Sequence, residues 1–141
     1  MIAIDASDDG DHVLEAVKEL EDRNPADYHV LTAIPPLVTQ VAGMDPSANS
    51  WSLAGIEQQI AEQAAESVKK RAAAHGISTD RVHLRNGKPS SVIQDFAEEV
   101  GADLIVIGSH ARKGIARLML GSTANAVLHG APCDVLTIRV R

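Results

Sequence analysis

Residues 102–123 read ADLIVIGSHARKGIARLMLGST, and this stretch decides the fold. Its first part, Leu104–Ile107, is a continuous apolar run, which predicts a strand buried at the centre of a sheet. A glycine-rich loop over 108–121 is expected next, followed by a short helix over Ser122–His129. A buried strand that leads through a loop into a helix is one unit of an alternating α/β sheet.

The rest of the 141 residues repeats this alternation. Further strands are predicted by apolar or alternating runs at Met1–Ile4, Tyr28–Ile34, Arg81–Asn86 and Asp134–Val140. Apolar residues at helical spacing predict the intervening helices at 13–20, 56–76 and 89–100, and a long loop without periodicity is expected over 35–53. The pattern predicts one domain, 1–141, with a doubly wound five-stranded parallel sheet and helices on both faces.

Ligands of such sheets bind outside the carboxyl ends of the strands, where the strand order reverses. Two strand ends carry suitable residues, Asp5 after the first strand and Gly108 after the fourth. Asp5 could bind a ligand there, or it could cap the first helix or tighten its turn.

Composition excludes several classes of partner. The net charge is −6 and only 2% of residues are aromatic, so neither a basic patch nor an aromatic platform for nucleic acid is expected. The single cysteine, Cys133, cannot form an internal disulfide and indicates a reducing compartment. No apolar run approaches the ~18 residues of a membrane span. We therefore expect a cytoplasmic protein that binds neither nucleic acid nor membrane.

The segment 108–123 has the chemistry of a phosphate site. Gly108, Gly114 and Gly121 allow close approach of the backbone to an anion. Ser122 and Thr123 stand at the expected N-terminus of a helix, whose free N–H groups and dipole favour negative charge. The segment contains three basic residues and no acidic one; the basic residues are Arg112, Lys113 and Arg117. The alternative is a turn and a helix cap with solvated basic residues.

Several short segments resemble the universal stress protein family. That family's ATP-binding pattern is Gly-x-x-Gly, nine residues, then Gly-Ser/Thr, and here Gly108 and Gly121-Ser122 match it at the correct spacing. Ala111 occupies the position of the second glycine, which is a departure from the pattern. The resemblance extends over nearly the whole chain through Ile4–Ser7, Gly87–Pro89, Ala102–Gly108 and Ala131–Leu136.

The resemblance implies an adenine nucleotide alpha hydrolase-like sheet of strand order 3-2-1-4-5 and ATP as the ligand, which could carry Mg²⁺. It implies that Asp5 contacts the ribose or adenine. The adenine pocket would be lined by Ala3, Ala33 and Ile107, and the phosphates would be held by Gly108, Ala111, Gly121, Ser122 and Thr123. Arg112 would add positive charge there, and His110 could donate to a phosphate, act as a base or simply be solvated.

The residues outside this segment give weaker indications of function. The remaining histidines lack metal-ligand spacing, so no metal site is expected. The acidic turn of Asp8, Asp9 and Asp11 is interpreted as the start of a helix, although a magnesium ion carried by ATP could be met there. Trp51 could dock the long loop or contact the ligand. The apolar strand at 135–140 would be a sheet edge in a monomer, so a homodimer through it is expected, as is common in the family.

Three functions remain open at this point. The first is an ATP-binding stress-response or signalling module with slow or no hydrolysis. The second is a relative that binds no nucleotide and acts through protein contacts, which Ala111 favours. The third is an enzyme, for which Asp5 and His110 are the available acid or base groups. No catalytic residue is assigned.

Overall fold

Five parallel strands form one sheet in the order β3-β2-β1-β4-β5, which confirms the predicted order. The computed structural model describes residues 1–7, 9–21, 28–36, 50–110 and 121–140. The strands are β1 (Ile2–Ala3), β2 (Val30–Ile34), β3 (Val82–Asn86), β4 (Leu104–His110) and β5 (Asp134–Val140). The helices are α1 (Asp9–Glu21), α2 (Ser50–Ala74), the 3-10 turn η2 (Thr79–Arg81), α3 (Pro89–Glu99) and α4 (Ser122–Gly130).

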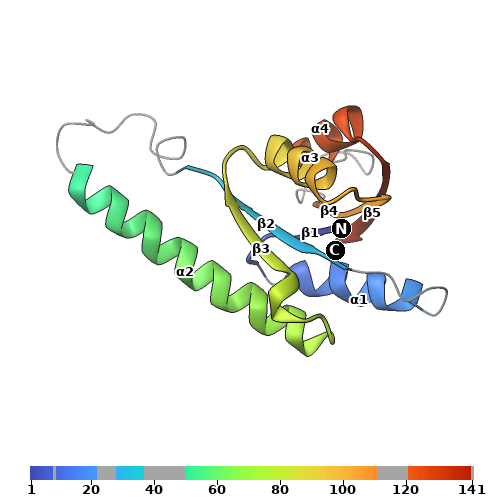
Figure 1. Cartoon of the computed structure of the whole chain (residues 1–141), viewed down its shortest axis with the longest axis horizontal. Coiled ribbons are helices and arrows are strands. Elements are labelled where there is room, and N and C mark those ends of the chain that lie inside the picture. Colours follow the sequence, from blue (N-terminus) through green and yellow to red (C-terminus); the bar gives the residue numbers. More distant parts are fainter. Residues whose placement is uncertain (8, 22–27, 37–49, 111–120, 141) are drawn as a thin grey trace.

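The helices cover both faces of the sheet, as Figure 1 shows, with α1 and α2 on one side and α3 and α4 on the other. Each side has its own apolar core. The α1 and α2 side buries a cluster that includes Ile2, Leu14, Val30 and Val68. The α3 and α4 side buries Leu31, Phe96, Ile105 and Val127. Consecutive residues of β1, β2, β4 and β5 therefore contribute to opposite cores.

The central strand β1 is short and well paired. Ile2 and Ala3 lie opposite Val30 and Leu31 of β2 on one side, and opposite Val106 and Ile107 of β4 on the other. The backbone N–H of Ile4 still donates to the Leu31 carbonyl at 3.0 Å, so the chain leaves the sheet only after Ile4.

Two predicted boundaries are wrong. Gly108–His110 belongs to β4 and not to a loop, because these residues continue the ladder with Ile138–Val140 of β5. Helix α2 begins at Ser50, inside the segment 35–53 that was expected to be a loop. Gly55 costs a helix about 1 kcal/mol relative to alanine, and a helix of 25 residues tolerates that cost.

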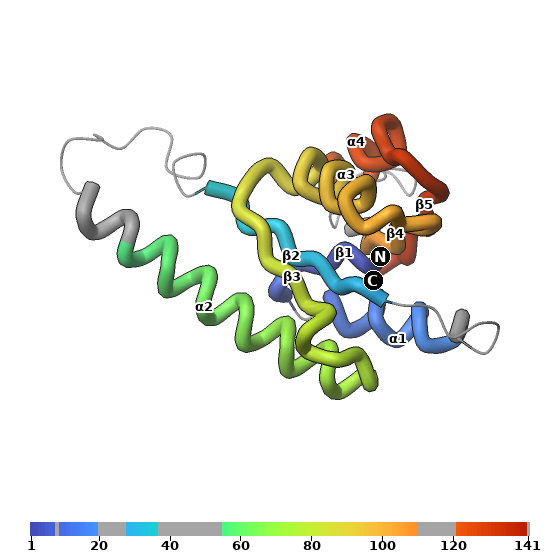
Figure 2. Tube along the Cα trace, viewed as in Figure 1, coloured from blue at the N-terminus to red at the C-terminus, as the bar shows by residue number. Residues whose placement is uncertain are grey.

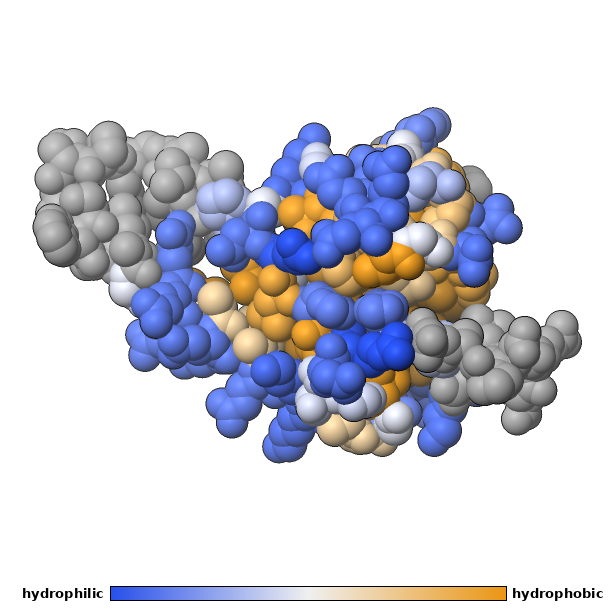
Figure 3. Space-filling view, viewed as in Figure 1, coloured by the Kyte–Doolittle hydropathy of each residue, from blue (hydrophilic) through white to orange (hydrophobic). Residues whose placement is uncertain are grey.

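Helix α2 extends past the edge of the sheet, as the green segment of Figure 2 shows. Val68 and Ala72, in its C-terminal half, are fully buried in the core. Ile56 and Ile60 continue the same four-residue spacing, but they are 46% and 41% exposed. In the space-filling view of Figure 3, blue hydrophilic side chains gather over α2 and α3, and orange apolar ones show over the strands between them.

Candidate functional site

A cavity of about 280 Å³ lies at the carboxyl ends of β1, β2 and β4, where the strand order reverses. This is the place where doubly wound sheets bind ligands, and the volume is near the lower end for small-molecule pockets. The first turn of α1 and the starts of α3 and α4 complete its walls. The lining residues are Ala3, Ile4, Asp5, Asp9, Gly10, Val13, Leu31, Ala33, Pro35, Pro89, Ile93, Ile107, Gly108 and Thr123.

The cavity brings together more than half of the residues that the sequence indicated. Those that line it are Ala3, Asp5, Ala33, Ile107, Gly108 and Thr123. Gly121 and Ser122 stand beside Thr123 at the N-terminus of α4, but they are not among the lining residues. His110 ends β4, opposite Val140. Ala111 and Arg112 lie outside the residues that the structure describes.

Gly108 is needed for close packing and not for an unusual backbone angle. Among the described glycines, positive φ values occur only at Gly76, Gly87 and Gly101. A Cβ on Gly108 would lie 3.1 Å from Cγ2 of Val13 and 3.2 Å from Cγ2 of Val140. The absence of a side chain therefore lets α1 and β5 approach the end of β4, where the cavity begins.

Asp5 organises the turn that leads from β1 into α1. Its Oδ1 accepts hydrogen bonds from the backbone N–H of Ser7 at 3.1 Å and from the Ser7 hydroxyl at 2.5 Å. The N–H of Gly10 then donates to the Ser7 carbonyl at 3.2 Å. The turn-forming role of Asp5 is thus present in the structure, and the exposed carboxylate also lines the cavity.

The first turn of α1 forms a wall that sequence reasoning largely missed. Asp9, Gly10 and Val13 all face the cavity. A Cβ on Gly10 would lie 3.2 Å from the Asp5 carbonyl oxygen, so glycine allows the helix to start close to β1. The sequence signal is the Asp-Gly-Asp run of 9–11, which by itself predicts only a helix start or a place to meet magnesium.

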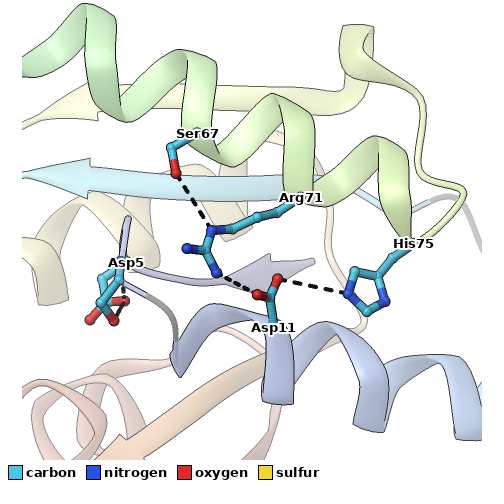
Figure 4. Close-up of polar contacts among 6 residues, drawn as sticks. Asp5, Asp11, Ser67, Arg71 and His75 are labelled. Carbon is cyan, nitrogen blue, oxygen red and sulfur yellow. Dashed lines mark hydrogen bonds and ion pairs between the residues drawn. The ribbon is translucent and has the colours of Figure 1, made fainter.

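Side chains of α2 contact this wall through Asp11 of α1, as Figure 4 shows. Arg71 Nη1 contacts Asp11 Oδ2 at 2.5 Å, and His75 Nε2 lies 3.8 Å from Asp11 Oδ1. Arg71 also donates from Nε to the Ser67 hydroxyl at 3.5 Å. The Arg71 side chain is only 16% exposed, whereas that of Asp11 is 49% exposed. The contact fixes the helix turn next to the two residues, Asp9 and Gly10, that line the cavity.

The N-terminus of α4 supplies an anion-attracting group of backbone atoms. The helix begins at Ser122, and the first residues of any helix have N–H groups without intrahelical acceptors. Thr123, on this first turn, reaches the cavity. A negatively charged group near Thr123 would therefore meet free N–H groups and the positive end of the helix dipole.

The part of the chain that the structure describes contains neither a cluster of metal ligands nor a membrane-spanning helix. Within residues 1–7, 9–21, 28–36, 50–110 and 121–140, no three histidine, cysteine or acidic side chains gather into a metal-binding group. In the same part of the chain, no helix combines the length and apolar character that a bilayer crossing requires.

Comparison with known proteins places the chain in one family. Residues 1–139 match the Universal stress protein family. Universal stress protein A homolog 2 of Coxiella burnetii is 35% identical over 140 residues, which cover 99% of this chain and 92% of that protein. Universal stress protein A homolog 1 of the same organism is 30% identical, with 98% and 93% covered.

Solved structures share the fold. Universal stress protein UspA from Lactobacillus plantarum superimposes with a TM-score of 0.76 at 23% identity, covering 98% of this chain and 96% of that one. A universal stress protein in complex with cAMP gives a TM-score of 0.67 at 22% identity, with 99% and 95% covered. From the match over 1–139 and the relatives in Coxiella burnetii, we conclude that this chain belongs to the universal stress protein family and that its role lies in the stress response.

Proposed function

We propose that the cavity binds an adenine nucleotide, ATP, and that the protein is a small cytoplasmic stress-response and signalling module with slow or no ATP hydrolysis. The observation that carries this proposal is the position of the cavity. Its apolar walls, which include Ala33 and Ile107, lead to Thr123 on the first turn of α4. An apolar slot suits a flat purine ring, and a helix N-terminus suits a phosphate group.

The other walls fit the remaining parts of a nucleotide. The exposed carboxylate of Asp5 can accept a hydrogen bond from a ribose hydroxyl or an adenine amino group. Asp9 lies where a magnesium ion carried by ATP could be met. The relative solved in complex with cAMP supports the nucleotide class of ligand.

Slow or absent hydrolysis follows from the kind of side chains present. Among the lining residues that the structure describes, the titratable ones are Asp5 and Asp9. The Oδ1 atom of Asp5 already accepts two hydrogen bonds from Ser7, which uses part of its capacity as a base. The alternative function is that of a family member without a nucleotide, acting through protein contacts, and Ala111 in place of a motif glycine favours it.

We further propose that the protein is a homodimer that pairs through 135–140. Strand β5 lies at the end of the sheet, so one side of its backbone has no neighbouring strand among the described residues. An open apolar edge strand favours association, and a two-fold pair would cover it.

The decisive experiment is to denature freshly purified protein and to analyse the released small molecules by mass spectrometry. Stoichiometric ATP or another adenine nucleotide would support the proposal. If none is released, thermal unfolding with millimolar Mg-ATP comes next, since a bound ligand raises Tm by mass action. An empty protein whose Tm does not change would contradict nucleotide binding and favour the protein-contact alternative.

A pair of variants locates the site. Ala33→Leu adds three carbons inside the cavity, and Ala73→Leu adds the same three carbons on the exposed surface of α2. We expect Ala33→Leu to reduce the Tm increase that Mg-ATP causes, while Ala73→Leu keeps it. Equal Tm increases in both variants would mean that the nucleotide binds elsewhere.

A further inference from the structure

Two histidines that are 54 residues apart in the sequence meet where β2 and β3 begin. His29 Nδ1 lies 3.0 Å from His83 Nε2, and the second ring nitrogen of His29, Nε2, lies 3.2 Å from Arg81 Nη1. The parallel register that sets Leu31 opposite His83 brings the rings together. Phe96 of α3 packs against both, with ring centroids 4.7 Å from His83 and 6.1 Å from His29.

The arginine determines which nitrogen carries each proton. A guanidinium only donates, so His29 Nε2 must accept from Arg81. A neutral His29 then carries its proton on Nδ1 and donates it to His83 Nε2, which must be unprotonated. The three side chains therefore form one directed hydrogen-bond chain, and it is complete only while both imidazoles are neutral.

The same geometry argues against a metal ion between the rings. A metal on His29 Nδ1 would move the proton to Nε2, where it would point at the Arg81 donor. A metal-bound histidine normally gives its other N–H to an acceptor and not to a cation. The contacts therefore favour a role that depends on the protonation of the two rings and not on a bound metal ion.

The surrounding charges oppose protonation as well. The pKa of His83 is lowered, first by burial and then by the charges of His29 and Arg85, with a smaller effect of Arg81 in the same direction. Glu99 of α3 acts in the opposite direction, but Arg85 Nη2 binds its two carboxylate oxygens at 2.8 Å and 3.2 Å. Protonation of His83 would break its hydrogen bond with His29 and would place a positive charge near the guanidinium groups of Arg81 and Arg85.

We propose that Arg81, His29 and His83 form an acid-sensitive latch, which fastens the edge strand β3 and the turn η2 to β2 at neutral pH and loosens when either ring is protonated. Among the strands that the structure describes, β3 pairs only with β2, so the latch acts at an edge of the sheet. This inference does not depend on nucleotide binding.

The direction of the pH effect follows from linkage. The ordinary pKa of histidine is about 6.5. Because the pKa of His83 is lowered in the folded protein, the unfolded chain takes up the proton more readily. The contribution to stability is therefore complete above that ordinary value and is lost as the pH falls below it toward the folded pKa.

Histidine NMR on the unaltered protein is the first test. Nitrogen shifts of the rings are expected to show His29 with its proton on Nδ1 at neutral pH. The ring of His83 is expected to titrate at a lower pH in the folded protein than in the urea-unfolded chain. A proton on Nε2 of His29, or a His83 midpoint that unfolding does not raise, would overturn the latch.

Hydrogen exchange of the β3 amides tests the opening. After correction for the intrinsic pH dependence of exchange, acidification through the histidine range should increase opening on the order of fivefold, the equilibrium factor of one net hydrogen bond. The double variant His29→Gln/His83→Gln has neither imidazole, so its opening should no longer depend on pH in this range, whereas His12→Gln on the exposed side of α1 should behave as wild type. Unchanged acid loosening in the double variant would refute the latch. The NMR test remains decisive if a variant fails to fold.

Discussion

Arg71 of α2 binds Asp11 of α1 at 2.5 Å and so connects the long helix to the turn that forms one wall of the cavity. The two residues are 60 positions apart in the sequence, and no local pattern indicates that they meet. Since Asp11 is half exposed, the contact should be weaker than a buried ion pair.

Replacing this arginine should measure the strength of the contact. We expect Arg71→Met to lower the free energy of unfolding by about 1 kcal/mol, a value reduced for the exposure of Asp11. Lys70→Met, on the exposed side of the same helix, is the matched control and should change stability little. Urea unfolding measures both, and equal effects would show that Asp11 gains nothing from Arg71.

Two glycines should respond to alanine in opposite directions. Gly108→Ala places a methyl group within 3.2 Å of Val13 and Val140, and we expect it to destabilise the fold by roughly 1–3 kcal/mol. Gly55→Ala adds a methyl group, in the interior of α2, that meets nothing within 4 Å among the described residues, and it should stabilise by up to about 1 kcal/mol. Thermal unfolding distinguishes them, and a stable Gly108→Ala protein would contradict the packing role of this glycine.

Replacing the buried Thr32 by valine should increase the stability of the fold. Its side chain is 3% exposed, and its hydroxyl has no hydrogen-bond partner among the described residues. A buried hydroxyl without a partner costs free energy, so Thr32→Val should stabilise the protein by roughly 1 kcal/mol. Thr79→Val, at an exposed position of η2, is the control. Destabilisation by Thr32→Val in chemical unfolding would mean that the hydroxyl has a partner, such as a bound water.

The thiol of Cys133 should react slowly. Burial is the main cause that raises its pKa, so the fraction of thiolate at neutral pH is smaller than for a free cysteine. We expect Ellman's reagent to modify the native protein more slowly than the urea-unfolded chain at the same pH. A native thiol that reacts faster than the unfolded one would contradict a buried Cys133 with a raised pKa.

The proposed dimer can be tested at the edge strand. Thr137→Glu places two like charges across a two-fold axis at β5, and we expect the mass measured by analytical ultracentrifugation to shift toward that of a monomer. Thr79→Glu, far from β5 in the sheet order, should leave the mass unchanged. A wild-type protein that is already monomeric at micromolar concentration would contradict the dimer.

Sequence patterns predicted the strands because each strand is a compact apolar or alternating run, and Asp134–Val140 matches its predicted bounds; the order of the strands was implied by the family resemblance. They failed at Gly108–His110, where pairing with β5 outweighs the loop preference of glycine. The start of α2 was missed because Ser50 and its neighbours are common in loops and at helix starts alike.

The candidate site was predicted from two residues expected just after strand ends: Asp5, which follows β1, and Gly108, which lies inside β4. Both line the cavity. Pro89 and Ile93 reach the cavity only because α3 crosses that edge of the sheet, which no local pattern encodes. The pair His29 and His83 was missed for a similar reason, since the register between β2 and β3 and not sequence spacing brings the rings together.

The position of β1 at the centre of the sheet affects the order in which the protein can form during translation. Ile2 and Ala3 can pair with β2 as soon as β2 has been made, but their other partner, β4, begins only at Leu104. At about 5–20 residues per second, one edge of this apolar strand stays unpaired on the ribosome for roughly 4 to 15 s. The half-sheet β3-β2-β1 is thus exposed to chaperones and to other nascent chains before β4 closes it.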